Sequence, residues 1–366
     1  MKISVERDTL LRPLQLVGGV VERRQTMAIL GHVLLVADEG RLTATATDLE
    51  VEISAEAEVP AQEPGRTTVP ARKLLDICRA LPEGSEITLA AEGERVTVRS
   101  GRSRFVLAAL APDTFPTMER LEAAQTLEVP QALLRELIER THFSMAHQDV
   151  RYYLNGLLLE VSEGRLAAVA TDGHRLACCE RAVAVSSPGT QQVIVPRKAV
   201  SELLRVLGDG EEPATLELAT NHLRVLVPGV RFTAKLIDGR YPDYRRVIPP
   251  GGERHLTADR EALREALGRA SILSNEKYRG VRLQMEDGTL RIQAHNPEQE
   301  EAEEELEVRY QGGPLTIGFN VGYLLDVLSA LPGETVEASF TDANSSCLIT
   351  APGAEGCRYV VMPMRL

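Results

Sequence analysis

The stretch TDGHRLA, from Thr171 to Ala177, contains residue types that acid–base chemistry uses. Asp172 lies two residues before His174, and a carboxylate that orients an imidazole is a common way to activate a nucleophile or a water molecule. A hydrolase that uses His174 and Asp172, or the carboxylates near Glu300, is therefore one hypothesis. No GxSxG, HExxH or GxxxxGK(S/T) motif accompanies the stretch, so a structural or recognition role is favoured.

A threefold internal repeat places this stretch in context. Three similar segments begin at Gly40, Gly164 and Gly288, and each step of 124 residues is close to one third of the chain. The segments PARKLLDICRALP, PRKAVSELLRVLG and FNVGYLLDVLSALP repeat in nearly the same register. The counterparts of TDGHRLA are TDLEVEI and HNPEQEE. Neither of these keeps the histidine in its place, which argues against a catalytic His174.

Each copy is predicted to hold two helices and two sets of strands. Apolar residues recur at helical spacing in ALLRELIERTH and PRKAVSELLRVLG, so each helix has one buried face. Stretches such as RLTATATDLEVEISAEAEV alternate apolar and polar residues between glycines, as antiparallel strands and hairpins do. The sequence therefore predicts an α+β fold of three repeated domains, at residues 1–121, 127–243 and 244–366.

The composition is that of a folded, acidic protein, with 43% hydrophobic residues, 26% charged residues and a formal net charge of −12. This charge weighs against nucleic acid, because binding to phosphates depends mainly on Lys and Arg. Residues 1–15 lack the apolar stretch of a signal peptide, and no apolar run is long enough to span a bilayer. The cysteines are odd in number and without CxxC spacing, which argues against a disulfide framework and a zinc site and predicts a reduced, cytoplasmic setting. They are Cys78, Cys178, Cys179, Cys347 and Cys357.

The predicted helices could line a ring. Six helices about 10 Å apart would enclose a circle about 19 Å across, whereas the twelve helices of two chains would enclose one about 38 Å across. The larger circle admits a DNA duplex with water around it. The six helical segments carry 15 Lys and Arg against 11 Asp and Glu, so the acidic excess lies elsewhere in the chain. This distribution fits a DNA-facing surface and fits equally a solvated helix face.

Long motifs throughout the chain resemble those of one known family. They are TTVPARK, FSMAHQDVRYYLNG, VATDGHRLA, LIDGRYPDYRRVIP, ILSNEKYRGVRL, NPEQEEAEEELEV and YVVMPMRL. From Met1 to Leu366 the sequence resembles the bacterial DNA polymerase III β subunit, the sliding clamp. The resemblance implies a ring-shaped homodimer with helices inside and antiparallel sheets outside. Such a ring encircles duplex DNA and tethers polymerases for processive synthesis, without catalysis and without a cofactor.

The resemblance also implies a set of DNA-contacting residues. The loop AHQDVRYYLNG is expected to touch DNA, although adjacent tyrosines in a strand usually point to opposite faces. Contacts of this kind go to the sugar–phosphate backbone and carry no base recognition, as sliding requires. The segment RRQTMAIL, residues 23–30, departs from the family, which more often has prolines there. The implied residues are Arg24, Arg72, Gln148, Tyr152, Tyr153, Arg197 and Lys198.

The apolar end of the chain is implied to belong to a pocket for short linear motifs of partner proteins. Methionine side chains suit such a pocket, because flexible thioethers adapt to several ligands. Val360 and Val361 are equally typical of residues that merely end a strand, and Asn344 replaces an apolar residue common in the family. The implied pocket residues are Leu154, Thr171, Gly173, His174, Arg175, Leu176, Pro242, Arg246, Val247, Tyr278, Asn320, Tyr323, Ser346, Val360, Met362, Pro363, Met364 and Arg365.

A head-to-tail dimer contact is predicted from the opposite character of two segments. SGRSRFVLAAL in the first copy is basic and apolar, whereas NPEQEEAEEELEV in the third is acidic. Facing each other, they would close a ring of two chains, with the ion pairs setting orientation more than affinity. The expected interface residues are Lys73, Arg104, Phe105, Leu107, Ile272, Leu273, Glu300, Glu301, Glu303 and Glu304.

The resemblance further implies the partners. They are double-stranded DNA held by topology, a second copy of the chain, the polymerase III catalytic subunit, clamp-loader subunits, translesion polymerases, ligase and mismatch-repair proteins, and no membrane. One further alternative stays open beside the hydrolase: an acidic protein scaffold that does not encircle DNA. Such a scaffold would tolerate charge reversal at Arg24 and Lys198, whereas a hydrolase would lose its activity on His174→Ala.

Overall fold

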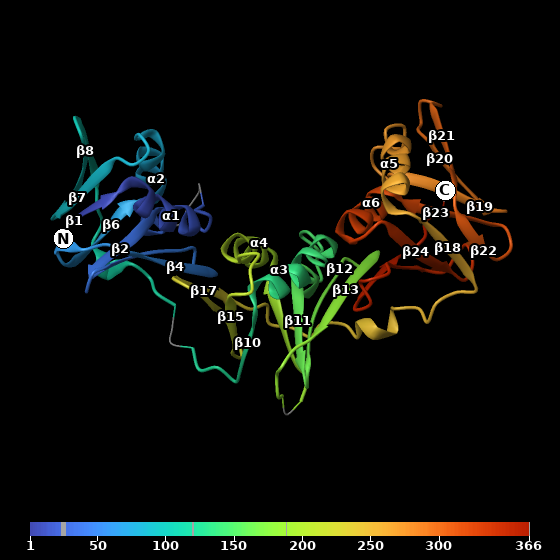
Figure 1. Cartoon of the computed structure of the whole chain (residues 1–366), viewed down its shortest axis with the longest axis horizontal. Helices are drawn as coiled ribbons and strands as arrows, with labels where there is room; N and C mark the ends of the chain where they lie inside the picture. The colour runs from blue at the N-terminus through green and yellow to red at the C-terminus, as the bar shows by residue number, and fades with distance from the viewer. Residues whose placement is uncertain (23–26, 119–120, 188, 366) are drawn as a thin grey trace. The chain divides into compact units, whose positions relative to one another are not determined.

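The computed structural model describes residues 1–22, 27–118, 121–187 and 189–365, and the chain divides into two compact units, each of which we describe by itself (Figure 1). The first unit comprises Met1–Arg135 and Lys198–Leu236, and the second comprises Glu136–Arg197 and Ile237–Leu366. The central third of the chain therefore contributes to both units. The division runs through helix α3 (Gln131–Glu139) and the start of helix α4 (Arg197–Val206).

The first unit is built on two antiparallel sheets. Helices α1 (Arg7–Gly18) and α2 (Ala71–Ala80) pack against each other, and α1 also packs on strands of the larger sheet. The smaller sheet has the order β5 (Ala61–Glu63), β1 (Lys2–Glu6), β7 (Glu86–Glu92), β8 (Arg95–Ser100), β9 (Ser103–Ala108). The larger sheet has the order β10 (Gln125–Pro130), β15 (Pro213–Leu218), β16 (His222–Val227), β17 (Val230–Lys235), β4 (Val51–Glu58), β3 (Arg41–Thr47), β2 (His32–Asp38), β6 (Gly65–Pro70).

The second unit repeats this plan. Helices α5 (Arg260–Ser271) and α6 (Val321–Ala330) lie side by side in Figure 1. The hairpin of β20 (Thr289–His295) and β21 (Glu301–Glu307) lies beside α5. One sheet has the order β14 (Gln191–Pro196), β11 (Gly156–Ser162), β12 (Arg165–Thr171), β13 (Arg175–Ala182), β26 (Cys357–Val361), β25 (Cys347–Thr350), β24 (Thr335–Phe340), β18 (Arg254–Asp259), β22 (Arg309–Gln311). The other has the order β21 (Glu301–Glu307), β20 (Thr289–His295), β19 (Gly280–Glu286), β23 (Leu315–Asn320).

Local sequence explains where α5 and α6 begin and which face they bury. Asp259 accepts a hydrogen bond from the Ala262 N–H at the start of α5, and Asn320 accepts one from the Gly322 N–H at the start of α6. These side chains satisfy backbone donors that the first helical turn leaves unpaired. In both helices, residues at helical spacing face the core. The α+β prediction with antiparallel sheets is confirmed.

Each of the two large sheets joins strands from different thirds of the chain. In the first unit, β17 pairs with β4, placing Val230 opposite Ala55. In the second unit, β26 pairs with β13, placing Cys357 opposite Cys179. Backbone hydrogen bonding therefore continues from one repeat into the next, and the two junctions have the same antiparallel form.

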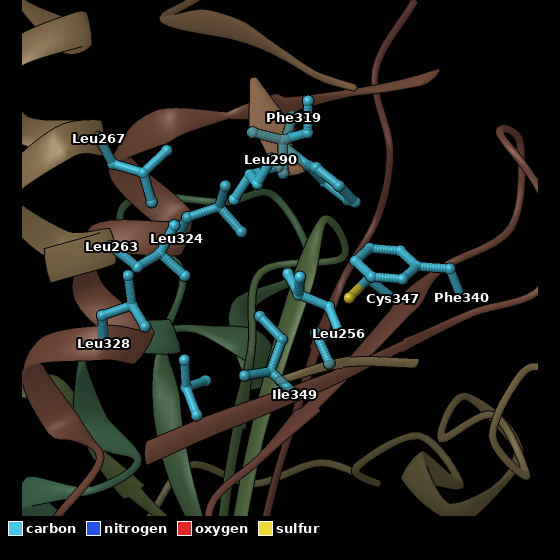
Figure 2. Close-up of a pocket in the computed structure, with 13 residues that line it drawn as sticks. Leu256, Leu263, Leu267, Leu290, Phe319, Leu324, Leu328, Phe340, Cys347 and Ile349 are labelled. Carbon is cyan, nitrogen blue, oxygen red and sulfur yellow. The ribbon is translucent and has the colours of Figure 1, made fainter. Parts of the chain in front are cut away.

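The core between α5, α6 and their sheets contains an apolar cavity of about 30 Å³ (Figure 2). Its lining is aliphatic and aromatic apart from the thiol of Cys347, and includes Phe319, Leu324 and Phe340. Without a charged or hydroxyl-bearing lining residue, this cavity belongs to core packing rather than to a chemical site. In the described part of the chain, no helix is both long and apolar enough to cross a membrane.

The expectation that the cysteines form no disulfide is wrong at one pair. Cys179 and Cys357 are bonded, with their Cα atoms 4.1 Å apart. The two cysteines are 178 residues apart in sequence. Neither their spacing nor their number reveals the pair, because only the register of β13 against β26 places them opposite each other.

Thiol counting tests this pairing. We predict that alkylation of the unfolded, unreduced chain modifies only Cys78, Cys178 and Cys347, because the other two sulfurs are bonded to each other. Mass spectrometry of chain blocked at lysis should show three labelled cysteines, and five after reduction. The variant Cys357→Ser should show a fourth label, on Cys179. Five labels without reductant would contradict the pairing.

Candidate functional site

The floor of the candidate pocket is an apolar cluster in the second unit. Leu154, Leu176 and Val360 pack together there, and Tyr241 and Tyr244 join them. The first three come from a 3-10 turn η4 (Tyr152–Leu154), from β13 and from β26, and Leu176 lies opposite Val360 in the strand pairing. The floor therefore forms where the central third of the chain meets the last third.

The end of the chain changes from buried to exposed within a few residues. Val360 and Val361 are buried strand residues, as the strand interpretation expects. Met362 is 46% exposed, and its N–H donates to the His174 carbonyl over 2.9 Å. The N–H of Met364 donates to the Gly318 carbonyl over 2.9 Å, so residues beyond β26 are still held by backbone bonds.

Asp172 acts on backbone geometry rather than on the imidazole of His174. Its Oδ1 accepts the N–H groups of His174 (2.9 Å) and Arg175 (3.0 Å), and its Oδ2 accepts Arg175 Nε (3.1 Å). Gly173 between them has φ of +89°, where a Cβ would lie 3.0 Å from the Arg151 guanidinium. The carboxylate that could orient a catalytic histidine is therefore used to hold a turn.

Arg175 joins this turn to α6. Its guanidinium lies 5.6 Å from the ring centre of Phe143 and 4.4 Å from that of Tyr323. It also pairs with Asp172 and, over 2.5 Å, with Asp326. The Arg175 side chain is only 11% exposed, so these contacts fix one side of the pocket.

The remaining candidate pocket residues fall into a buried group and an exposed rim. Thr171 is buried and donates to the Arg175 carbonyl, Asn320 caps α6, and Ser346, Pro363 and Met364 are partly buried. The exposed rim residues are Gly173, His174, Pro242, Arg246, Val247, Tyr278, Met362 and Arg365. Asn344 is exposed as well. Apolar exposure is high on this rim, at 49% for Val247 and 56% for Tyr278.

A neighbouring hollow of about 410 Å³ contains residues that the sequence analysis did not single out. Tyr278, Met364 and Arg365 line it together with four new residues and Gly280. The new residues are Asn275, His295, Asn296 and Pro297. His295–Pro297 occupies the repeat position of Thr171–Gly173, so the repeat itself was a signal that could have found three of them.

The candidate DNA residues have varied surroundings, and Arg24 lies outside the described residues. Tyr152 is 57% exposed, whereas Tyr153 packs against the floor cluster. The tyrosines lie in a 3-10 turn and not in a strand, with ring centres 5.8 Å apart. Gln148 has φ of +54° in the same exposed loop, where Val150 is 95% exposed. This loop therefore presents one aromatic ring outward.

The basic candidates are already engaged within the chain. Arg72 donates to the Val21 carbonyl over 3.1 Å, and Arg197 donates to the carbonyls of Met145 and Ala146. Lys198 pairs with both Glu22 and Asp48. Burial lowers the pKa of Lys198, but its hydrogen bonds with these two carboxylates outweigh burial, so the pKa is raised. A phosphate that contacts Lys198 must compete with two carboxylates.

Six of the candidate interface residues lie on β9 and β21, two strands that end their sheets, and the other four lie outside them. β9 carries Arg104 exposed, Phe105 half-buried and Leu107 buried, and β21 carries an alternating row of exposed glutamates. Ile272, just beyond α5, is 77% exposed. Lys73 is exposed on α2, Leu273 is half-buried, and Glu300, Glu301 and Glu303 are exposed. Glu304 differs from expectation, because Arg269 of the same chain binds it through two hydrogen bonds of 2.7 and 2.9 Å.

Comparison with known proteins decides the family. Models described as the N-terminal, central and C-terminal domains of the DNA polymerase III beta subunit match residues 1–119, 128–243 and 245–365. The chain belongs to the DNA polymerase III beta subunit family, the sliding clamps. It is 53% identical to the Beta sliding clamps of Escherichia coli K12 and Pseudomonas putida KT2440, each matched over 100% of both chains.

Solved structures agree with this assignment. The DNA polymerase III subunit beta from Pseudomonas aeruginosa superimposes with a TM-score of 0.96 at 51% identity, over 100% of both chains. The clamp of that organism bound to griselimycin gives a TM-score of 0.97 at 51% identity, again over 100% of both chains. The chain is therefore a DNA sliding clamp, a non-catalytic processivity factor, and the hydrolase hypothesis is wrong.

His142, beside the Arg175 cluster, provides a test of the electrostatics. Burial, followed by the positive charge of Arg197, lowers its pKa, although Glu139 and Asp326 act in the opposite direction. We predict that the imidazole titrates below pH 6.5 in the folded chain. The unfolded chain then takes up the proton first, so His142 reduces stability as the pH falls through about 6.5. An NMR titration, assigned with His142→Gln, measures this midpoint, and Arg197→Gln should raise it. A midpoint at or above pH 6.5 would contradict the prediction.

Proposed function

We propose that the chain acts as a ring-shaped homodimer that encircles duplex DNA and tethers the replicative polymerase and other replication and repair proteins. The observation that carries the proposal is the state of two edge strands, β9 and β21. In the described part of the chain, β9 pairs only with β8, and β21 pairs only with β20. Exposed strand edges of this kind are templates for pairing with another chain.

The threefold repeat says which strand each edge should meet. At both junctions within the chain, the fourth strand of one repeat pairs with the last strand of another: β4 with β17, and β13 with β26. By the same rule, β21 of the third repeat should pair with β9 of the first. Because that pairing joins the two ends of the repeat series, a second copy of the chain is the partner that closes the ring.

The register of the proposed junction follows from the existing ones. In the β8–β9 hairpin, Ser103 lies opposite Ser100, and in the β16–β17 hairpin, Val230 lies opposite Val227. Ser103 of β9 and Val230 of β17 therefore hold equivalent positions. Glu304 of β21 pairs with Ile292, and Ala55 of β4 pairs with Ala44. Ile292 and Ala44 each lie four residues after the glycine that begins their repeat segment, so Glu304 and Ala55 are equivalent. Val230 lies opposite Ala55, so Ser103 should lie opposite Glu304 of the second copy.

The same register predicts which side chains face each other across the proposed interface. Arg104 would face Glu303, and Phe105 would face Ala302. Leu107, Ile272 and Leu273 would add apolar area, with Lys73 and the glutamates at 300 and 301 on the rim. Glu304 would leave Arg269 or share it, a small cost for an exposed ion pair.

For DNA, we propose sequence-independent contacts from Arg24, Arg72, Gln148, Tyr152, Tyr153, Arg197 and Lys198. Contacts to the sugar–phosphate backbone let a ring slide, because they are the same at every step along the duplex. The exposed ring of Tyr152 can stack on an unpaired base. The acidic net charge opposes tight phosphate binding, so retention on DNA should come from topology.

For proteins, we propose that the pocket over Leu154, Leu176 and Val360 binds short linear motifs. Its support is a buried apolar floor with an exposed apolar rim at Val247 and Met362. The proposed partners are the polymerase III catalytic subunit, clamp-loader subunits, translesion polymerases, ligase and mismatch-repair proteins. We also propose a cytoplasmic location and domains at 1–121, 127–243 and 244–366, close to the matched ranges.

Cross-linking tests the dimer and its register. We predict that Ser103→Cys combined with Glu304→Cys yields a covalent dimer of two 40.0 kDa chains, because the paired positions match those of Cys357 and Cys179. Non-reducing electrophoresis measures the dimer fraction. Ser103→Cys with Glu301→Cys is the mismatched control and should cross-link far less. A monomer by light scattering, or equal cross-linking in the control, would count against the proposal.

Retention on DNA tests encirclement. We expect the chain, loaded on nicked circular DNA by an active clamp loader with ATP, to stay bound until a restriction enzyme linearises the circle. Only a topological link is lost by cutting, whereas ordinary phosphate binding is not. Arg104→Glu should shorten retention, because like charges would face each other at the junction, and the added Glu303→Arg should restore it. Retention unchanged by cutting would contradict encirclement.

A further inference from the structure

One buried carboxylate lies behind the proposed partner pocket. Glu160 on β11 is 0% exposed and accepts four hydrogen bonds. We propose that Glu160 is a positioning residue, which fixes the pocket wall formed by residues 242–247 in the arrangement that binds partner motifs. This inference rests on the pocket proposed above and names a residue that holds it in place.

Two of the four bonds come from the wall itself. The Tyr244 hydroxyl donates to Glu160 Oε1 over 3.2 Å, and the Arg245 guanidinium binds the same oxygen. Arg245 also lies over the Tyr244 ring, 4.8 Å from its centre. Tyr244 and Arg245 begin the 3-10 turn η5 (Tyr244–Arg246), so the carboxylate holds the turn at its first two residues.

The other two bonds come from the sheet. Arg165 on β12 donates to Oε1 over 2.7 Å, and Gln192 on β14 donates to Oε2 over 2.6 Å. Neighbouring strands of one sheet therefore hold the carboxylate from both sides. A buried charge is tolerated when it is paired and hydrogen-bonded, and removal of its partners is costly. Glu160 is thus a fixed point to which the wall is attached.

The wall has little else to fix it. Within residues 236–253, all of which the structure describes, η5 is the only helix or strand. No sheet ladder holds this segment. The Ile237 N–H donates to the Ile194 carbonyl over 2.9 Å, and beyond the start of the segment its position depends mainly on side chains. Tyr241, Tyr244, Ile237 and Ile248 give apolar contact with the floor cluster, and Glu160 gives the polar anchor.

The residues expected to meet a partner lie directly beside the anchor. Arg246 and Val247 follow Arg245 and are exposed, and Pro242 lies two residues before Tyr244. The Val247 N–H donates to the Tyr244 carbonyl over 3.0 Å. The position of Tyr244 therefore also restrains that of Val247. A binding surface loses affinity when its supporting contacts allow it to move.

The test uses griselimycin as the probe, because it is bound in two solved clamps of the family. Its dissociation constant is measured for the full chain by calorimetry. We expect Glu160→Gln to weaken binding about tenfold, since bonds to a charged group are lost. Tyr244→Phe and Arg245→Gln should each weaken it by a smaller factor. In a chain that already carries both changes, Glu160→Gln should add nothing further.

Glu180 provides the matched control. It belongs to the same polar network, pairing with Arg165 (2.6 Å) and Arg358 (3.1 Å), and lies on β13 rather than against the wall. Glu180→Gln should leave griselimycin affinity unchanged. Hydrogen exchange supplies an independent readout: the Val247 N–H should exchange faster in Glu160→Gln, while the β11–β12 ladder keeps its protection.

Unchanged griselimycin affinity in a folded Glu160→Gln chain overturns the proposal. If that variant does not fold, unchanged affinity in both Tyr244→Phe and Arg245→Gln overturns it equally. Val247→Asp, on the rim of the pocket, should also weaken binding, which would show that griselimycin occupies the pocket. Absence of binding by the wild-type chain, or binding that Val247→Asp leaves unchanged, overturns the pocket and the role of Glu160 together. Topological retention of Glu160→Gln on circular DNA should equal that of the wild type, so failure of retention concerns the ring and not this inference.

Discussion

The rest of the structure depends on the continuity of backbone hydrogen bonding from one repeat to the next. A repeat of this kind leaves two strand edges with unpaired N–H and C=O groups, and those groups need partners. The chain pairs such edges within itself at two junctions, where β17 pairs with β4 and β26 pairs with β13. At the two ends of the repeat series remain the equivalent edges, a basic, apolar one at β9 and an acidic one at β21. Pairing of those two edges is the basis of the proposed closed assembly of two chains.

The candidate pocket is a consequence of the second junction. Leu176 and Val360 lie opposite each other because β13 and β26 pair, and the turn at Asp172 lies between β12 and the start of β13. Residues from distant parts of the sequence thus meet on one apolar floor. Arg175 supports one side of it through Phe143 and Tyr323, and Glu160 supports another through Tyr244 and Arg245. Charged groups here act as structural fixings around an apolar surface.

Two charged residues that are expected to contact DNA or a second chain form ion pairs within this chain. Lys198 is held by Glu22 and Asp48, and Glu304 is held by Arg269, although each is expected to meet a different partner in the working assembly. The Arg269–Glu304 pair is partly exposed, and such a pair contributes little net free energy, so it can be exchanged for a second chain at small cost. The Asp48 side chain is buried, so exchange of the Lys198 pairs for a phosphate costs more. The formal net charge of −12 does not exclude a DNA sliding clamp, because net charge averages over all faces of the molecule. It is consistent with the proposed retention by enclosure rather than by attraction.

The sequence by itself determined the three repeats, the α+β fold and the family, because those depend on local periodicity and on long motifs. For Val360 and Val361 it left a strand end and a pocket lining both open. Only the tertiary structure decided that Cys179 bonds Cys357, that Asp172 holds a turn, that Tyr152 and Tyr153 lie in a 3-10 turn, and that Glu160 anchors Tyr244. Two of these, the Cys179–Cys357 bond and the Glu160–Tyr244 bond, join residues far apart in the chain. The first depends on the register of β13 against β26, and a register shift of one residue would move such side chains to the opposite face.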